Sequence, residues 1–368
     1  MIEKKIGFDA RKIKDYGIGT YIQNILLRVP DSLSAYCFNL FCYFNDIDYI
    51  QKEINQNFLY IPAAAPHYSL REHIILSRLA KKLELYLLHT PHYVVPAFIK
   101  CKSIVTIHDV IHLLYPGKGL AQKLIASFLM RSSIRKATRI ITVSENSRKD
   151  IIRFFPEAES RITVIYNGVD EYFLSDYNEA VMKDSVSIYD LPSRYILYVG
   201  NHLKHKNIEK LVRAFALFSA QKKEYSLLLV GGIRLAGLKN ELPDSLLSKI
   251  KIVPFIDKKV LKAIYHKADF LVMPSLYEGF GLPLLEAMAC RTPVMCSDIA
   301  VFHEIAHDIP LYFNPQNEQE MLDSMLNLSE NKKLKETMAS KGYERAQDFT
   351  WKKSAQQHSK IYHEIVQI

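Results

Sequence analysis

The stretch Phe270-Leu-Val-Met273-Pro-Ser-Leu-Tyr-Glu278-Gly-Phe-Gly281-Leu-Pro-Leu-Leu-Glu286-Ala-Met-Ala289 decides how this chain folds. Its first four residues are apolar and predict a buried strand. Two glycines then permit a tight turn, and Pro283 suits the first position of a helix. A strand, a glycine turn and a helix in succession form the unit from which parallel sheets covered by helices are built.

This unit recurs along the chain, because short apolar runs alternate with helix-period segments. A first series of predicted strands comprises Lys5–Phe8, Asn39–Tyr43, Leu85–His89, Ser103–His108, Arg139–Val143 and Ile162–Tyr166. A second series comprises Tyr195–Val199, Ser226–Val230, Lys251–Pro254, Phe270–Met273, Thr292–Cys296 and Leu311–Phe313. The predicted helices include Tyr21–Val29, Leu120–Arg135, Ile208–Gln221 and Lys258–His266. The fold class is therefore α/β, with two Rossmann-like, doubly wound parallel sheets.

A length of 368 residues accommodates two such domains. The polar stretch Asp170–Pro192 separates the two series, so we predict one domain over residues 1–186 and a second over 187–348. After a second polar run, Ser329–Thr350, a last helix is predicted within residues 349–368. Since doubly wound sheets bind ligands beyond the carboxyl ends of their strands, the loops there are the candidate site.

The composition excludes a disordered protein, a disulfide-stabilised one and one that spans a membrane. The chain is 49% hydrophobic, as in globular proteins, and its five cysteines form no CxxC pair, which indicates free thiols in a reducing compartment. The N-terminus lacks the apolar core of a signal peptide, and no apolar run approaches the ~20 residues of a membrane span. We therefore expect a cytoplasmic protein.

The net charge of +9 is concentrated in one region. Residues 100–153 hold eleven basic residues and three acidic ones, which suits an anionic partner. No zinc spacing, RNP-like stretch or helix-turn-helix supports a nucleic-acid partner. The segment Leu120–Arg135 is compatible either with an anionic membrane surface or with an ordinary helix that faces the core. Its apolar residues include Leu120, Leu124, Ile125, Phe128, Leu129 and Ile134, and they lie among Lys123, Arg131 and Arg135.

Four loops follow predicted strands and carry candidate ligand-binding residues. After Phe8, Gly17 and Gly19 would let a ligand approach the start of a helix, although Ile22 breaks the dinucleotide-binding spacing. His108 is the last residue of another predicted strand, Ser103–His108. The loop after Val199 holds Asn201, Lys204, His205 and Lys206, which concentrate positive charge near a helix start.

The fourth loop is the stretch quoted above. We expect Glu286 in the first turn of its helix, so that Glu278 and Glu286 face one ligand across the turn. Capping and the helix dipole could explain Glu286 alone. They explain neither Glu278 nor the two glycines, so a binding function is favoured.

The E-x7-E stretch with its internal Gly-Phe-Gly-Leu-Pro resembles the signature of retaining glycosyltransferases of family GT4, which have the GT-B fold. The resemblance extends over nearly the whole chain. It includes Gly17-Ile-Gly-Thr-Tyr21, His89-Thr-Pro-His92, Thr106-Ile-His-Asp109, Ile141-Thr-Val-Ser-Glu-Asn-Ser147, Tyr166-Asn-Gly-Val-Asp170, the loop from Val199 to Asn207, and the helix that begins at Trp351. The first and third of these look most like bacterial O-antigen and exopolysaccharide mannosyltransferases.

The resemblance implies the role of each candidate residue. His108, Glu278 and Lys206 would be the catalytic set, with Lys206 on the donor diphosphate. The donor-binding residues would be Gly17, Gly19, Asn201, His205, Lys206, Phe255, Gly279, Phe280, Gly281, Leu282 and Glu286. The N-terminal domain would bind the acceptor, and the last helix would cross back onto it. The anomeric configuration would be retained.

The implied donor is a nucleotide sugar, with GDP-mannose the best guess, and the implied acceptor is a saccharide or a lipid-linked glycan. Donors based on UDP, ADP or dTDP, and a non-catalytic sugar-nucleotide-binding subunit, stay open as alternatives. Docking on the cytosolic face of the inner membrane through residues 118–153 is also implied.

Three positions depart from the pattern of the family. Asn201 stands where many relatives have Arg, Arg291 replaces a glycine after the E-x7-E helix, and Pro254 replaces the glycine before Phe255. No metal or other cofactor is expected, because amides, a helix start and Lys206 suit the charge of a leaving diphosphate. An Asp46-Ile-Asp48 pattern also occurs, and we expect no metal there.

Overall fold

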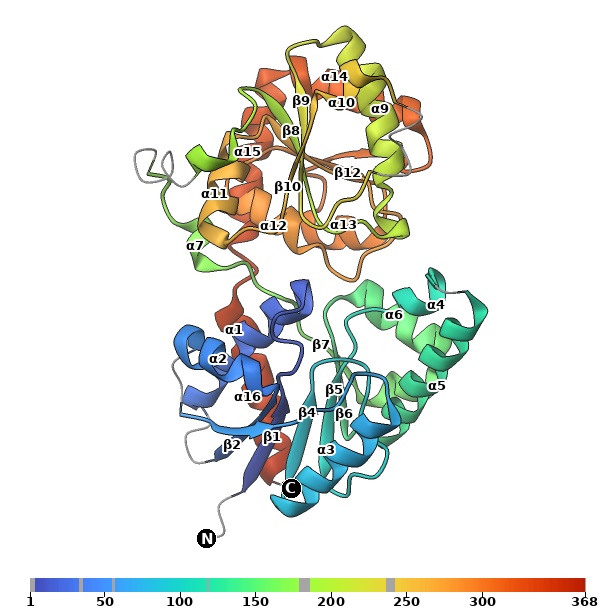
Figure 1. The fold of residues 1–368 in the computed structure, drawn as a ribbon, viewed down its shortest axis with the longest axis vertical. Coiled ribbons are helices and arrows are strands. Elements are labelled where there is room, and N and C mark those ends of the chain that lie inside the picture. The colour runs from blue at the N-terminus through green and yellow to red at the C-terminus, as the bar shows by residue number, and fades with distance from the viewer. Residues whose placement is uncertain are drawn as a thin grey trace. The chain divides into compact units, whose positions relative to one another are not determined.

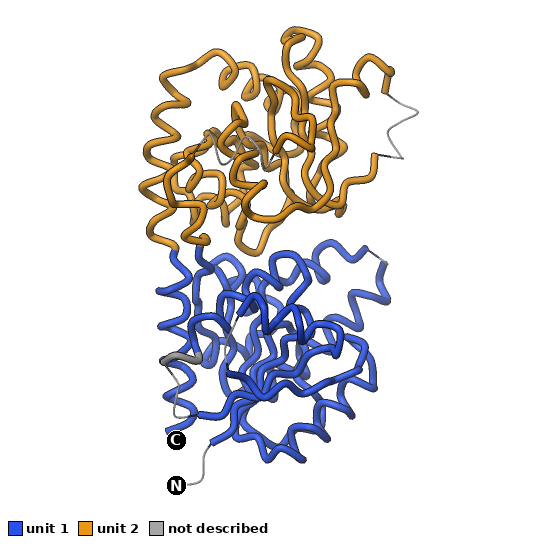
Figure 2. The backbone as a smooth tube through the Cα atoms, turned by 60° about the vertical axis from the view of Figure 1, so that its left-hand side comes forward, with its two compact units in different colours: residues 1–168, 350–368 blue, residues 169–349 orange. Residues whose placement is uncertain are grey.

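The computed structural model describes residues 4–32, 36–54, 57–117, 119–178, 186–235 and 242–367. The chain divides into two compact units (Figure 2). Residues 1–168 and 350–368 form the first unit, and residues 169–349 form the second. Each unit has a central sheet with helices packed on it (Figure 1).

The sheet of the first unit has seven parallel strands in the order β3-β2-β1-β4-β5-β6-β7. Its strands are β1 Lys5–Asp9, β2 Cys37–Cys42, β3 Leu59–Pro62, β4 Leu87–Thr90, β5 Lys102–Thr106, β6 Arg139–Thr142 and β7 Ile162–Val164. Sequence reasoning missed the edge strand β3. Leu59 and Pro62 are exposed there, so the strand carries no clear apolar pattern.

The helices of the first unit are α1 Tyr16–Ser32, α2 Ile47–Ile54, α3 Leu70–Lys82, α4 Ile111–Leu114, α5 Leu120–Lys136, α6 Glu145–Phe154 and α16 Trp351–Gln367. Two of these helices are capped at their N-terminus by a serine side chain. Ser69 accepts from the backbone amide of Glu72 before α3, and Ser144 accepts from that of Ser147 before α6. Helix α16 lies along α1, so the last segment of the chain packs beside the first helix (Figure 1).

The second unit has six parallel strands in the order β10-β9-β8-β11-β12-β13. They are β8 Tyr195–Val199, β9 Ser226–Val230, β10 Ile250–Val253, β11 Phe270–Met273, β12 Val294–Ser297 and β13 Leu311–Phe313. Its helices are α7 Glu171–Leu174, α9 Ile208–Gln221, α10 Asp244–Leu247, α11 Lys258–Lys267, α12 Leu282–Ala289, α13 Ala300–Ala306, α14 Glu318–Glu330 and α15 Lys332–Ala346.

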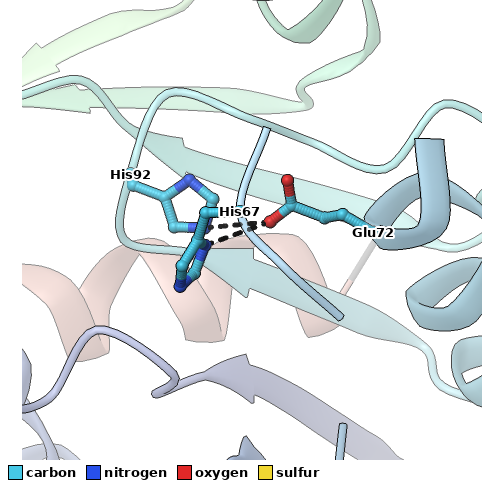
Figure 3. Close-up of side chains that lie close together, drawn as sticks. All are labelled: His67, Glu72 and His92. Atoms are coloured by element: carbon cyan, nitrogen blue, oxygen red, sulfur yellow. Dashed lines mark hydrogen bonds and ion pairs between the residues drawn. The ribbon is translucent and has the colours of Figure 1, made fainter. Parts of the chain in front are cut away.

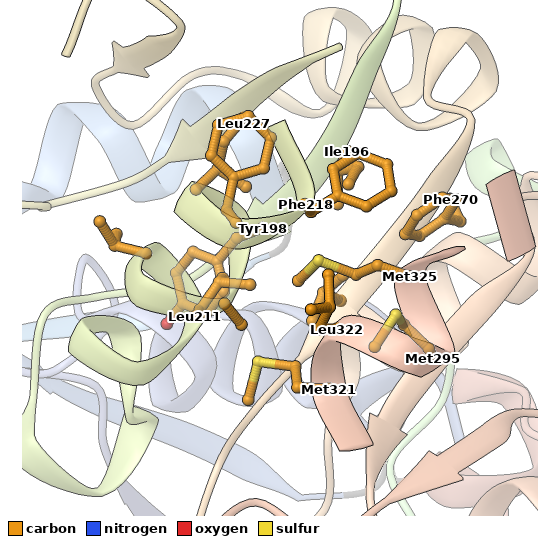
Figure 4. Packing of buried hydrophobic residues seen from close by; sticks show 14 of the residues in the cluster. Ile196, Tyr198, Leu211, Phe218, Leu227, Phe270, Met295, Met321, Leu322 and Met325 are labelled. Atoms are coloured by element: carbon orange, nitrogen blue, oxygen red, sulfur yellow. The ribbon is translucent and has the colours of Figure 1, made fainter. Parts of the chain in front are cut away.

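The core of the second unit joins its sheet to several helices, among them α9 and α14 (Figure 4). Phe270 of β11 packs in one buried cluster with Phe218 of α9 and Met325 of α14. All three side chains are fully buried. The apolar strands that predicted a parallel sheet thus form the middle of this unit, and their carboxyl ends lead into the candidate loops.

The boundary between the two units lies earlier in the chain than predicted. The first unit ends at Gly168, not at residue 186, and the second unit continues to Phe349. The described part of the predicted linker Asp170–Pro192 contains α7, whose Phe173 is buried and packs edge-on against Tyr265 of α11. Residues 179–185 of that linker lie outside the described residues.

Two further expectations need correction. The polar run Ser329–Thr350 contains helix α15, whose buried face includes Met338 and Ala346. Its mostly polar composition concealed the periodicity of this helix. Helix α1 begins at Tyr16 and not at Tyr21, so Gly17 and Gly19 lie inside its first turn and not in a loop before it.

Candidate functional site

The candidate residues of the second unit lie on two loops that the sheet brings together. Strands β8 and β11 are neighbours and parallel, so the loops that follow Val199 and Met273 leave the same edge. A backbone hydrogen bond links them, because the amide of Leu276 donates to the carbonyl of His205 at 2.7 Å. The two loops therefore lie side by side at one edge of the sheet.

An ion pair joins these loops. Lys206 Nζ donates to Glu278 Oε1 at 2.6 Å, and Ser275 Oγ donates to the same oxygen at 2.7 Å. The side chains are only 17% and 11% exposed, so solvent screens the pair weakly. The cation and the carboxylate thus hold each other, and a bound anion would compete for Lys206.

Asn207 fixes the position of this lysine. Its backbone is left-handed, with φ of 57°, and it ends the short turn Lys204–Lys206 just before α9. Its side-chain amide donates to the carbonyls of Pro274 at 3.1 Å and Pro315 at 2.8 Å. Sequence reasoning missed both Asn207 and Ser275, although asparagine is among the non-glycine residues that adopt the left-handed conformation most often.

The Gly-Phe-Gly turn ends in a left-handed glycine. Gly281 has φ of 100° and directly precedes α12, and a Cβ there would lie 2.9 Å from the ring of Phe302. Phe280 is buried and packs edge-on against Phe349, while Gly279 lies between Glu278 and this ring. The turn accordingly requires glycine at position 281 and is held by buried aromatic contacts.

Helix α12 starts at Leu282, which makes Pro283 its second residue and Glu286 its fifth. The prediction that Glu286 lies in the first turn and Pro283 at the first position is wrong. Because the helix dipole acts mainly within the first turn, helix capping no longer accounts for Glu286.

Glu286 is instead held by a phenol. Tyr265 donates its hydroxyl hydrogen to Glu286 Oε2 at 2.9 Å. Burial raises the pKa of this carboxyl to about 7, against which the hydrogen bond from Tyr265 acts. Such a group costs stability when ionised, which is typical of a residue kept for its ligand.

The loop after β8 contains a second indication of a ligand. The backbone carbonyl of Asn201 accepts from Tyr198 at 3.0 Å, but its side-chain Oδ1 is buried and has no hydrogen-bond partner. A buried acceptor without a donor is costly, and a bound hydroxyl would satisfy it. His205, on the same loop, is buried.

A glycine that sequence reasoning missed lies beside this loop. Gly231, after β9, has φ of 127°, and a Cβ on it would lie 1.9 Å from the carbonyl oxygen of Gly200 and 3.1 Å from the ring of Phe255. Phe255 is 44% exposed, so part of its ring lies at the surface beside this loop. The pair Gly231-Gly232 after a buried strand was the available signal.

In the first unit, His108 lies two residues beyond β5 and not at its end. Its Nε2 bonds the carbonyl of Pro91 at 3.0 Å; a carbonyl only accepts, so Nε2 carries the hydrogen and Nδ1 is an acceptor. Burial lowers the pKa of His108 to about 4, so the ring is neutral at pH 7. The ring of Tyr21 packs edge-on against it at 4.9 Å.

A buried chain of hydrogen bonds ties Tyr21 to α16. His358 Nδ1 donates to the carbonyl of Ser354 at 2.7 Å, so its Nε2 must accept from the Tyr21 hydroxyl at 2.6 Å. Tyr21 then accepts from Thr106 at 2.9 Å, and Thr106 accepts from His89 Nε2 at 2.8 Å. The docked C-terminal helix thus supports the residue that packs on His108.

Metal-ligating side chains of the described residues come together at His67, Glu72 and His92 (Figure 3). The guanidinium of Arg11 already occupies the cation position, because its Nη2 lies 2.6 Å from Glu72 and 2.7 Å from Asp9. A divalent ion would have to displace this buried charge, so the cluster does not fit a metal. Elsewhere, Asp46 of the Asp46-Ile-Asp48 pattern pairs with Lys14 at 2.7 Å.

Two family models match the chain. One, described as glycosyl transferases group 1, matches residues 186–345, and the other, described as glycosyltransferase family 4, matches residues 47–172. The chain belongs to the GT4 family of glycosyltransferases. The Glu278–Glu286 stretch of this GT4 chain lies within the first match.

The relatives of this GT4 chain include polysaccharide mannosyltransferases. It is 32% identical over 244 residues to the O-antigen chain mannosyltransferase RfbU of Salmonella typhimurium, which covers 66% of this chain and 64% of that protein. It is 27% identical over 290 residues to the O-antigen chain mannosyltransferase B of Escherichia coli, covering 75% and 74%. The matched segment thus spans somewhat less than two thirds of RfbU.

Solved structures confirm the GT-B fold. Sucrose-phosphate synthase from Thermosynechococcus elongatus superposes with a TM-score of 0.79 at 21% identity over 99% of both chains. Anabaena HepE, crystallised with UDP and glucose, superposes with a TM-score of 0.77 at 18% identity over 98% of this chain and all of that one. The predicted fold class and family are therefore confirmed.

Proposed function

We propose that this GT4 chain transfers a hexose from a nucleotide sugar to a glycan or lipid-linked acceptor during the assembly of bacterial surface polysaccharide. Mannose from GDP-mannose is the first candidate donor, because the O-antigen relatives are mannosyltransferases. A UDP-hexose is the alternative, since the HepE structure contains UDP and glucose.

The Lys206–Glu278 pair carries this proposal. The two charges neutralise each other at 2.6 Å. On donor binding, the diphosphate would draw Lys206 away, and hydroxyls of the transferred sugar would replace the lysine on Glu278. Both residues would act at the Gly279–Gly281 turn, whose amides would face the phosphates. Glu286 would bind the ribose hydroxyls, and His108 would accept a hydrogen bond from the sugar through Nδ1.

The leaving diphosphate would be stabilised by Lys206, backbone amides and the start of α9, without a metal ion. The acceptor would attack from the face that the diphosphate leaves, so that the product retains the anomeric configuration. Turnover that survives a chelator and an α-linked product from an α-linked donor are the expected results. Loss of turnover with the chelator, restored by a divalent ion, would contradict metal independence.

The direct test uses the two members of the ion pair. Lys206→Ala and Glu278→Ala should abolish transfer from GDP-mannose and from UDP-glucose while circular dichroism stays unchanged. Lys210→Ala is the matched control, because this lysine of α9 donates to the backbone carbonyl of Gln316 at 2.6 Å and not to Glu278. Wild-type turnover in either site variant would refute the site. A thermal-shift panel of nucleoside diphosphates identifies the base.

We also propose that the first unit docks on an anionic membrane through α5. No helix among the described residues has the length and apolarity that crossing a membrane requires. Four large apolar side chains of α5 are nevertheless 58–73% exposed: Leu120, Leu124, Ile125 and Phe128. They lie near the bases Lys123, Arg131 and Arg135, which is the composition of a helix that lies in a membrane surface.

Liposome co-sedimentation tests this second proposal. Binding should require anionic lipid, should weaken with salt, and should fall in Leu124→Ser/Phe128→Ser. The double variant Leu217→Ser/Phe255→Ser, which removes two exposed apolar side chains of the second unit, is the control. Binding that ignores lipid charge would contradict the role of α5.

A further inference from the structure

The C-terminal helix α16 contributes buried polar side chains to the surroundings of Tyr21, the residue whose ring packs on His108. His358 and Tyr362 of α16 and Tyr21 of α1 are all 0% exposed, and the two helices lie side by side (Figure 1). A buried polar side chain without a hydrogen-bond partner is costly, so each of these groups has to be paired. Their hydrogen bonds therefore fix where they lie.

The hydrogen bonds of this group start from a backbone carbonyl of α16. Because the carbonyl of Ser354 only accepts, His358 Nδ1 carries the hydrogen and Nε2 accepts from the hydroxyl of Tyr21. Burial lowers the pKa of His358 to about 4, so this ring is neutral at pH 7. The hydroxyl hydrogen of Tyr21 thus points to His358, at 2.6 Å.

The directions of the remaining bonds follow from this one. Since the hydroxyl of Tyr21 donates to His358, its oxygen accepts from Thr106 at 2.9 Å. Thr106 then accepts from His89 Nε2 at 2.8 Å, which leaves the lone pair on His89 Nδ1 for the hydroxyl of Tyr362. Burial lowers the pKa of His89, so that ring is neutral as well. The chain begins and ends on α16, and His358 holds the acceptor on which its direction depends.

His108 needs a restraint that its own hydrogen bonds do not supply. Its Nε2 donates to the carbonyl of Pro91 at 3.0 Å, and its backbone carbonyl accepts from Ser147 Oγ at 3.0 Å. Nε2 lies close to the axis about which an imidazole ring turns, and this torsion has broad minima, so these bonds restrain Nδ1 only weakly. The ring of Tyr21 stands at 90° to that of His108, with centroids 4.9 Å apart. It therefore opposes the rotation that would turn Nδ1 away.

The place of the Tyr21 ring depends in turn on α16. Besides the bond from its hydroxyl to His358, the ring of Tyr21 packs edge-on against the rings of His358 at 5.5 Å and Trp351 at 6.3 Å. Trp351 and His358 lie about two turns apart on α16. The helix thus holds Tyr21 both at its hydroxyl and along its ring. Without the acceptor on His358, the hydroxyl of Tyr21 would have to turn to another partner.

We propose that His358 is a positioning residue for the transfer reaction, which through Tyr21 keeps the lone pair of His108 Nδ1 directed at the transferred sugar. The inference rests on the proposed function for the role of His108. His358 is fully buried and acts through Tyr21 alone. Because Nδ1 has to reach the sugar as its bond to the diphosphate breaks, a small rotation of His108 lowers the rate more than it lowers donor affinity.

Two variants of His358 separate its two hydrogen bonds. In His358→Asn, the amide nitrogen can donate to Ser354 in place of Nδ1, but nothing replaces Nε2 as the acceptor for Tyr21. In His358→Gln, the longer side chain brings an amide oxygen near the position of Nε2. His363→Asn is the matched control, because this histidine is on the same helix and packs edge-on against Tyr36 at 6.0 Å.

Steady-state kinetics with the nucleotide sugar is the first measurement. Folded His358→Asn should lose about ten- to hundredfold in kcat, with the KM for donor close to that of the wild type. His358→Gln should recover most of this loss, and His363→Asn should match the wild type. An unchanged kcat in folded His358→Asn, an equal loss in both His358 variants, or a change confined to KM would overturn the proposal. Should His358→Asn not fold, Tyr21→Phe, which keeps the ring and deletes the hydroxyl, decides.

NMR of the full chain with isotope-labelled histidine separates this inference from the proposed function. The carbon-bound ring protons of His108 lie beside the ring of Tyr21 and should be shifted by its ring current, and His108→Gln assigns them. This shift should be lost in His358→Asn and kept in His358→Gln and His363→Asn. A wild type that transfers no sugar would refute the proposed function, whereas the link from His358 to His108 would still stand on these shifts. Identical His108 shifts in folded His358→Asn and in the wild type would overturn the inference even in an active enzyme.

Discussion

Replacing Glu286 by glutamine should make the second unit more stable at neutral pH while weakening nucleotide binding. The carboxyl is buried and its pKa is raised to about 7. Folding therefore favours its protonated form, and ionisation costs stability. The glutamine side chain of Glu286→Gln would stay neutral at every pH and would still accept the hydrogen bond from Tyr265.

The size of the effect follows from the pKa values. A rise from 4.5 in the unfolded chain to about 7 in the folded one corresponds to about 3 kcal/mol, at 1.36 kcal/mol for each unit. Because the folded pKa is raised, the cost is absent below pH 4.5, grows as pH rises, and is complete above pH 7. It amounts to about 1 kcal/mol at pH 5 and about 3 kcal/mol at pH 8.

Urea unfolding of the wild type and Glu286→Gln between pH 5 and pH 8 measures this difference. Alkylation of Cys290 and Cys296, which are both buried in the second unit, reports the unfolding of that unit. The advantage of the variant should grow by about 2 kcal/mol over this range. A cost of burying the glutamine amide that does not depend on pH would not alter how the stability difference between the two proteins changes with pH. An advantage that is independent of pH, or that shrinks as pH rises, would refute a carboxyl with a raised pKa.

Three further predictions concern the rest of the molecule. Tyr21→Phe deprives His358 and Thr106 of a buried partner and should destabilise the first unit by about 1–3 kcal/mol, measured by fluorescence of Trp351, the one tryptophan of the chain. Gly231→Ala, whose Cβ would lie 1.9 Å from the Gly200 carbonyl at a φ of 127°, should destabilise the second unit and should weaken nucleotide binding by the folded variant about tenfold, measured by calorimetry. Burial lowers the pKa of His358 to about 4, so the stability that the first unit gains from burying this neutral ring is complete above pH 6.5 and is lost as pH falls towards 4. The urea midpoint of unfolding, followed by Trp351 fluorescence, should therefore fall on acidification. A midpoint that stays constant would contradict this.

Much of the architecture could be predicted, because buried parallel strands are apolar along their whole length. Each predicted strand forms, with ends that differ by at most two residues, as at Ser103–His108 against β5 Lys102–Thr106. The failures have physical causes. Strand β3 lies at an edge and is half exposed, and α15 presents few apolar residues. Neither has the burial that produces a strong apolar pattern.

The sequence places the candidate residues in space most reliably where one loop supplies them. Glu278, Gly279 and Gly281 lie at the turn that their spacing indicates, and Lys206 lies beside Glu278 as a ligand pair would. The partners Ser275 and Tyr265 were missed, because only the folded chain shows which hydroxyl meets which carboxylate. Tyr265 is on α11, one strand away along the chain, and no local motif marks it.

The two units share one feature that sequence could not reveal. Both units contain buried polar groups from which folding gains nothing. In the second unit, Glu286 carries a raised pKa and Asn201 Oδ1 has no hydrogen-bond donor, and in the first unit His67 Nε2 has no donor either. Proteins satisfy nearly all buried polar atoms, so such exceptions require a cause. A ligand that brings hydroxyl groups would supply a donor to Asn201 Oδ1 and His67 Nε2, which have none, and a further donor to Glu286, which already accepts from Tyr265. The proposed nucleotide sugar would thus account for the cost at Glu286 and at Asn201, since such a donor carries hydroxyl groups on its ribose and on its hexose.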